Sequence, residues 1–301
     1  MTLNLSLVTH DFAICVTDRR LSAPVGGIVS ERGNKLTVFE CRNARGFITY
    51  CGVGRDRNGQ SPNDWIADNP LLPSMTLDEF LKAIKNISDD RLRSLAVNGY
   101  DARHTFVVGG FVNGTPVLAM ISNYESLESE DVRDVPDPEL SIDFRMPSPE
   151  AKRPVIIGAT GDIPFDRKSS VAKIGGLAKG GLPPPTLVAR MTKLIRDVAY
   201  AADRKGSVGT SVNSVIVPRF GPAEIGADVV GGTSLLEPPN MISPGMTVRD
   251  VHIDVGENVS GSRYSRVHRK AIFRERRCPN CGTPVPEGYR QCGRCDAPVS
   301  A

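Results

Sequence analysis

The spacing of apolar residues in the first part of this chain predicts β-strands. Leu3, Leu5 and Leu7 alternate with polar residues, which is typical of a strand. Residues 9–11 (Thr-His-Asp) predict a turn, and the apolar run at residues 12–16 predicts a second strand. We therefore expect the chain to begin with two adjacent strands.

Two later segments have helical spacing instead. Residues 76–79 (Thr-Leu-Asp-Glu) form a capping box, which predicts a helix start, and we expect a second short helix after Ser88. The other helix follows the glycine- and proline-rich stretch 175–185, which we expect to be a flexible loop. Its apolar stripe consists of Leu187, Val188, Met191, Leu194, Ile195, Val198 and Ala202.

The remaining strands favour an α+β fold. Residues 104–112 and 116–122 flank Asn113-Gly114, a strong hairpin turn signal. Further strands are expected at residues 155–158 and 211–217 and around Val251, Ile253 and Val255. Because few segments have a strand–helix–strand pattern, we expect antiparallel sheets with segregated helices.

Thr2 is the first residue with candidate chemistry. If Met1 is removed, the Thr2 hydroxyl can act as a nucleophile, and the free α-amine of the same residue can act as its base. That amine titrates near 7.7–8.0 in model peptides, so it is partly neutral at pH 7. The alternative is that Thr2 is simply the first residue of an edge strand.

The order of the next polar residues resembles that of proteasome-type N-terminal-nucleophile (Ntn) hydrolases. Asp18 ends the second strand sixteen residues after Thr2, Arg20 follows closely, and Lys35 precedes a short strand. The resemblance implies that Asp18 holds Lys35 beside Thr2, where the Lys35 cation lowers the pKa of the α-amine. It also implies that Arg20 supports this cluster and that the amide of Val53, after Gly52, stabilises an oxyanion.

The same resemblance extends over roughly residues 2–220. The family's small-residue turn is matched at Ala159-Thr160, and Asp203 and Ser207 match residues that orient the terminal amine. It implies a four-layer αββα sandwich over residues 1–260. It further implies a threonine-type peptidase or amidohydrolase acting on peptide or isopeptide-like amides, and a ring or dimer of identical chains.

The last residues predict a metal site. Cys278, Cys281, Cys292 and Cys295 form two CxxC pairs, and four thiolates in two such turns can bind one tetrahedral Zn²⁺. The pattern resembles a zinc ribbon, over residues 278–301. Two disulfides or a redox CxxC are the alternatives; they fit less well because no secretory leader is recognised. A segment this short would need the metal in order to fold.

Composition limits the remaining functions. The 301 residues carry a net charge of +3, and no apolar run is long enough to span a membrane. Cys15, Cys41 and Cys51 are expected to be buried thiols in a reducing cytoplasm. Residues 123–152 are acidic and proline-rich, which predicts a surface excursion.

Residues 261–277 are strongly basic. We expect a solvated, partly helical linker there, and nucleic-acid binding through this segment and the ribbon is the less favoured interpretation. Two functions therefore stay open for the chain: an Ntn peptidase or amidase, and an inactive scaffold or assembly protein that recruits a protein partner through the ribbon.

Overall fold

The computed structural model describes residues 2–299 with several gaps. The gaps are residues 23–27, 32, 57, 68–73, 98, 100, 128–131, 149–150, 152–153, 165–167, 202–207, 231–246, 258–262, 274, 287–289 and 293–294. Asp203 and Ser207 therefore lie outside the described residues, and their predicted roles stay predictions.

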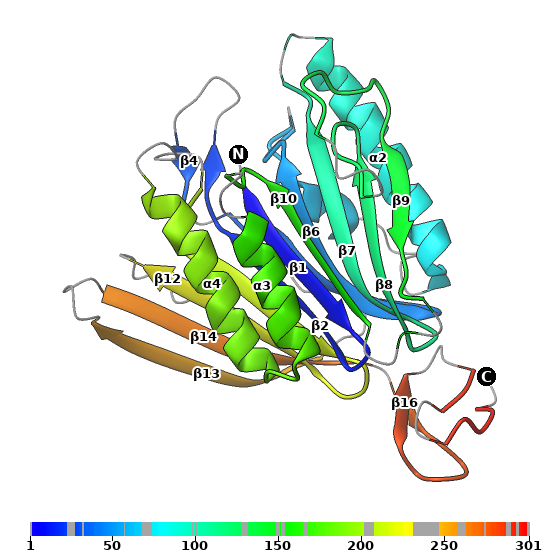
Figure 1. The fold of residues 1–301 in the computed structure, drawn as a ribbon. Helices are drawn as coiled ribbons and strands as arrows, with labels where there is room; N and C mark the ends of the chain where they lie inside the picture. The colour runs from blue at the N-terminus through cyan, green and yellow to red at the C-terminus, as the bar shows by residue number, and fades with distance from the viewer. Residues whose placement is uncertain are drawn as a thin grey trace.

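In the described part of the chain, the larger sheet has seven antiparallel strands (Figure 1). The expected N-terminal hairpin lies inside it, with Leu5 opposite Val16. From edge to edge the strands are β10 (Val155–Gly161), β1 (Leu3–Thr9), β2 (Phe12–Asp18), β11 (Val212–Pro218), β12 (Ala223–Val230), β14 (Arg263–Ile272) and β13 (Thr247–Glu257).

The second sheet has five antiparallel strands among the residues that the structure describes. In order they are β5 (Leu36–Cys41), β6 (Ala44–Gly52), β7 (His104–Val112), β8 (Thr115–Ser122) and β9 (Ser141–Arg145). The β7–β8 turn is the predicted one: Asn113 and Gly114 have φ values of 49° and 82°, the positive values that a tight hairpin needs. Two short hairpins accompany the sheets: β3 (Leu21–Ser22) with β4 (Ile28–Ser30), and β15 (Glu275–Arg277) with β16 (Pro284–Pro286).

Helices cover the outer faces of both sheets. α1 (Pro62–Ala67) and α2 (Leu77–Ala96) pack on the five-stranded sheet, and α3 (Lys168–Lys179) and α4 (Pro184–Tyr200) on the seven-stranded one (Figure 1). The capping box at Thr76 and Glu79 is confirmed. Two expectations are wrong: α2 continues through Ser88 instead of giving way to a second helix, and α3 extends to Lys179 into the expected loop.

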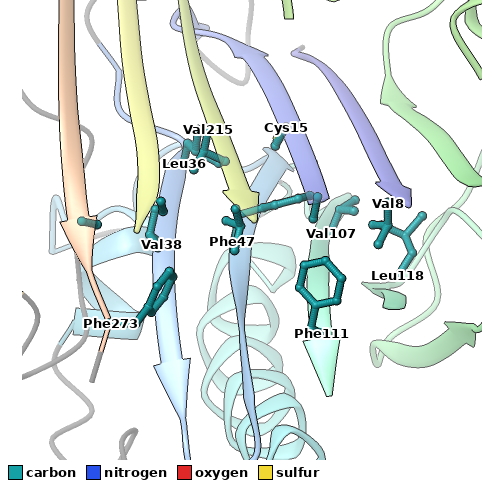
Figure 2. Close-up of a cluster of buried hydrophobic side chains, with 14 of the residues drawn as sticks. Val8, Cys15, Leu36, Val38, Phe47, Val107, Phe111, Leu118, Val215 and Phe273 are labelled. Atoms are coloured by element: carbon teal, nitrogen blue, oxygen red, sulfur yellow. The ribbon is translucent and has the colours of Figure 1, made fainter. Parts of the chain in front are cut away.

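Three clusters of buried apolar residues lie between the described layers. The middle cluster lies between the sheets, where Val8 from one sheet lies beside Leu118 from the other and Val215 lies beside Leu36 (Figure 2). The outer two clusters join each sheet to its helices. The predicted four-layer αββα sandwich is thus confirmed.

Two segments form strands that were not expected, because their many charged side chains obscure the alternating pattern that predicts a strand. Residues 263–272, expected to be part of a partly helical linker, form β14 inside the seven-stranded sheet. Ser265, Val267 and Ala271 are buried there, whereas Arg266, His268 and Lys270 alternate with them and face the other side of the sheet. Likewise, residues 141–145 of the acidic stretch form β9 at the edge of the other sheet.

Thr2 and the cysteine-bearing segment lie at opposite ends of the sandwich. Asp18 pairs with Val212 at the end where Thr2 lies, whereas Phe12 pairs with Pro218 at the opposite end. Arg45 of β6 donates to the Pro218 carbonyl at that opposite end and pairs with Glu275, which precedes the four cysteines. At about 3.3 Å per strand residue, the cysteine-bearing segment is thus joined to the sandwich about 20 Å from Thr2.

Candidate functional site

Thr2, Lys35 and Asp18 meet at the end of the first two strands. The Lys35 ammonium donates to the Thr2 hydroxyl, and it lies 3.3 Å and 3.4 Å from the two Asp18 carboxylate oxygens. All three side chains are buried, with exposures of 4% for Thr2, 1% for Lys35 and 0% for Asp18. The three residues are far apart in sequence, and the fold places them in direct contact.

Backbone amides fix the Asp18 carboxylate. Oδ1 accepts from the N–H of Leu3 at 2.9 Å, and Oδ2 accepts from the N–H groups of Arg20 at 3.0 Å and Gly209 at 3.1 Å. These donors come from β1, from the residues after β2 and from the segment before β11. The carboxylate therefore ties three parts of the chain to the position of Lys35.

Lys35 is held in an unusual environment for a cation. Burial lowers the pKa of Lys35 below its usual value, and the Asp18 carboxylate partly offsets this effect. An ammonium with a lowered pKa gives up its proton more readily. Lys35 can therefore donate to an oxyanion at Thr2 or share its proton with Thr2.

Asn34 positions the backbone that carries Lys35. Its carbonyl accepts from Tyr50 Oη at 3.2 Å and from Asn63 Nδ2 at 2.8 Å. Its side-chain oxygen accepts from Asn213 Nδ2 at 3.2 Å and from the Leu36 N–H, also at 3.2 Å. Sequence reasoning missed this arrangement; the only signal is that Asn34 directly precedes Lys35.

Gly161 allows β10 to approach Thr2. Its φ is +88°, and a Cβ at this position would lie 1.9 Å from the Thr2 carbonyl oxygen. The next residue, Asp162, donates its N–H to that same oxygen at 2.9 Å. Only a glycine therefore fits between Thr2 and the end of β10 without moving one of them.

A second buried polar cluster lies behind Gly161. Glu125 Oε1 accepts from the Gly161 N–H at 2.9 Å, and Cys51 Sγ lies 3.3 Å from Tyr124 Oη. Burial raises the pKa of both Glu125 and Cys51. No sequence pattern predicts this cluster, because Glu125 belongs to a stretch whose composition is typical of an acidic surface segment.

The other predicted residues are placed less directly. The Arg20 guanidinium pairs with Glu31, with Nη2 at 2.7 Å from a carboxylate oxygen, so Arg20 contacts Asp18 through its backbone amide. Gly52, at the end of β6, has φ +102° and packs against the Arg103 carbonyl. Val53 follows it and packs beside the cluster between the five-stranded sheet and its helices. The proposed role of its amide stays a prediction.

The four C-terminal cysteines form a separate cluster. Their sulfur atoms all lie within 4.8 Å of one another. Cys278 Sγ is 3.7 Å from Cys295 Sγ, and Cys281 Sγ is 3.5 Å from Cys292 Sγ. Four sulfurs at about 2.3 Å from a tetrahedral metal would be about 3.8 Å apart, so the donor set fits such an ion.

The two CxxC turns have matching backbone hydrogen bonds. The Gly282 N–H donates to the Cys278 carbonyl at 2.9 Å, and the Asp296 N–H donates to the Cys292 carbonyl at 2.8 Å. Gly282 and Asp296 both have positive φ values, 68° and 54°. This repeated turn directs the thiols of both pairs toward one point.

Comparisons with known proteins give similarity at the level of structure. No protein-family model and no curated protein matches the chain. An Anbu (Gly-1) mutant from Hyphomicrobium sp. strain MC1 is similar in structure, with a TM-score of 0.46 and 13% identity over 73% of this chain and 83% of that chain. Anbu (ancestral beta-subunit) from Yersinia bercovieri has a TM-score of 0.47 and 15% identity over 72% of this chain and 81% of that one.

None of the described helices combines the length and the apolar character needed to cross a membrane.

Proposed function

We propose that this chain is a threonine-type Ntn amidohydrolase or peptidase that becomes active when Met1 is removed. One observation carries the proposal: the Lys35 ammonium donates to the Thr2 hydroxyl while it lies against the Asp18 carboxylate. A buried lysine is costly unless it is paired. The pairing with Asp18 alone does not require Lys35 to lie against the hydroxyl of Thr2.

In the proposed reaction, Thr2 Oγ1 attacks the carbonyl carbon of an amide. The free α-amine of Thr2 accepts the hydroxyl proton and later gives it to the departing nitrogen as the C–N bond breaks. Lys35 stabilises the negative charge that develops on Oγ1, and Asp18 keeps Lys35 in place. The resulting ester is then hydrolysed by water, which regenerates Thr2.

The test compares Met1-free protein as wild type, Thr2→Ser and Thr2→Ala. Each is incubated with a small β-lactone, which acylates activated hydroxyls, and with an internally quenched peptide mixture. We expect acylation and cleavage in wild type and Thr2→Ser, and neither in Thr2→Ala. Equal reaction in wild type and Thr2→Ala, or none in wild type, overturns the proposal.

We also propose that the cysteine cluster binds one structural Zn²⁺. Cys278, Cys281, Cys292 and Cys295 would be its ligands, and the matching backbone turns and sulfur spacings support this assignment. When bound, the metal supplies folding energy to a segment with little core of its own. Elemental analysis of purified protein should give about one zinc per chain, and a metal-free but folded ribbon would contradict the assignment.

An inactive scaffold is the second candidate function, and burial is the observation that favours it. Thr2 is 4% exposed and Lys35 is 1% exposed, so a substrate must gain access to them. In that case the ribbon would recruit a protein partner. Retention of Met1 in the native protein would decide for this function.

The expected ring or dimer and the less favoured nucleic-acid binding also stay predictions. Native mass spectrometry measures the first. For the second, phosphate contacts would make affinity fall as salt rises, so a salt-independent affinity would argue against it.

A further inference from the structure

A pocket lies on the outer face of the seven-stranded sheet, beside α4. The helix packs against β2 and β11, and β12 and β14 continue the sheet beyond it (Figure 1). The pocket has a volume of about 590 Å³, which lies within the range of small-molecule sites, about 300–1,000 Å³. Described residues of α4, β11, β12 and β14 line it, and Thr2, Lys35 and Asp18 are not among them. The pocket is therefore separate from the candidate catalytic residues.

Gly226 of β12 leaves room for this pocket. Strand pairing places it opposite Ser214 of β11 on one side and opposite His268 of β14 on the other. A Cβ at residue 226 would lie 2.6 Å from Ser214 Oγ and 3.6 Å from His268 Nδ1, and all three residues line the pocket. The glycine thus keeps open a hollow that is bordered by a hydroxyl and an imidazole, two groups that form hydrogen bonds.

The charged residues of the pocket form two groups of ion pairs. Asp228 Oδ1 lies 3.0 Å from Arg196 Nη2, and Asp228 Oδ2 lies 3.2 Å from Arg266 Nε. Lys193 and Asp197 pair with each other at 2.7 Å. With histidine counted as neutral, the described lining therefore has three cationic side chains and two carboxylates, an excess of one positive charge.

The pocket has an apolar end as well as a charged one. Pro185, Val188 and Ala189, from the beginning of α4, line the apolar end. Arg196 lies seven residues after Ala189 on the same helix, which corresponds to about 10 Å at 1.5 Å per residue. A ligand that fits both ends therefore has an anionic group joined to an apolar body.

We propose that this pocket binds a small organic carboxylate with an apolar body. The carboxylate pairs with the guanidinium groups of Arg196 and Arg266, because guanidinium forms strong two-point contacts with carboxylates. The apolar body lies against the beginning of α4. An excess of one positive charge matches one carboxylate better than a phosphate group, which carries about two negative charges at pH 7. The inference goes beyond the proposed function, since it holds whether or not Thr2 is catalytic.

The first test compares two ligands that differ in charge. Biphenyl-4-acetate is the probe, and biphenyl-4-acetamide has nearly the same shape without the negative charge. Binding of each to the full chain is measured by isothermal titration calorimetry. We expect a submillimolar Kd for the carboxylate and a Kd at least about tenfold higher for the amide. No binding of the carboxylate, or equal Kd values for the two ligands, would overturn the proposal.

Two pairs of variants then locate the binding. Arg266→Gln removes a cation from the pocket, and its control Lys270→Gln removes one from the same face of β14, outside the described lining. Ala189→Trp fills the apolar end from an exposed position on α4, and its control Arg190→Trp adds the same ring at an exposed neighbour that is not among the described lining residues.

We expect each pocket variant to raise the Kd of biphenyl-4-acetate about tenfold and each control to change it less than about twofold. If both pocket variants bind the carboxylate as wild type does, or if the controls lose as much affinity as the pocket variants, the carboxylate binds elsewhere and the proposal is overturned. All four substituted positions are at least partly exposed, so the variants should fold.

Discussion

Replacing Gly161 with alanine tests whether β10 positions Thr2. The new Cβ would lie 1.9 Å from the Thr2 carbonyl oxygen, against about 3.4 Å for an ordinary contact, so one of the two must move by about 1.5 Å. The left-handed φ of +88° adds a strain of roughly 1–2 kcal/mol for any residue with a Cβ. A misplacement of about 1 Å at a reacting group can cost about 100-fold in rate.

Gly221 provides a matched control. Its φ is +91°, yet no neighbouring atom lies within 4 Å of a Cβ placed there. Gly221→Ala should therefore show the backbone strain without the collision.

The assay measures urea unfolding and the rate of β-lactone acylation for both variants in Met1-free protein. We expect both to lose stability, Gly161→Ala the more, and only Gly161→Ala to lose about 100-fold in acylation rate. If Gly161→Ala acylates as fast as Gly221→Ala, the argument that β10 positions Thr2 is refuted.

Three further changes test other parts of the structure. Asp18→Asn breaks the buried ion pair with Lys35, so it should lower the unfolding free energy by about 3–5 kcal/mol and abolish most β-lactone acylation. An unchanged denaturant midpoint would argue against this pairing. Burial lowers the pKa of His104 to about 3 from 6.5, so the folded chain keeps it neutral while the unfolded chain protonates it. The His104 contribution to unfolding free energy should therefore fall by about 1.4 kcal/mol for each pH unit below pH 6.5. His104→Phe lacks the titrating group, so the difference in unfolding free energy between wild type and His104→Phe should change with pH at that same slope. A difference that stays constant from pH 6 to pH 5 contradicts this. Chelating the ribbon metal should unfold residues 278–299, seen as loss of their amide protection, but leave Thr2 acylation unchanged, because the cysteine-bearing segment joins the sandwich about 20 Å from Thr2; a parallel loss of acylation would show that the two sites are coupled.

The site residues that sequence could predict are those in local strand patterns. Asp18 closes the second strand and Lys35 precedes the next one, so hydrophobic periodicity and the family resemblance together placed them. The metal ligands were predictable for a similar reason, since two CxxC pairs lie within eighteen residues. Each of these signals is local in the chain.

The residues that sequence could not predict act through long-range contacts. Glu125 reaches Gly161 across 36 residues, and Asn213 reaches Asn34 across 179. Neither contact follows from its neighbours in the chain, because each depends on how the two sheets stack.

The errors in secondary structure also have physical causes. The strand β14 was hidden because its outward face carries Arg266, His268 and Lys270, which outweigh the small buried residues between them. The helix α3 tolerates Gly175 because a Cβ there would lie 3.2 Å from Ile157 of β10, so the small residue permits close packing.

The most direct test of the central claim is tandem mass spectrometry of the N-terminal peptide, after native protein reacts with the β-lactone. The account predicts that this peptide begins at Thr2 and carries the acyl group on the Thr2 hydroxyl. A peptide that still begins with Met1, or one that begins at Thr2 without the acyl group, would contradict it.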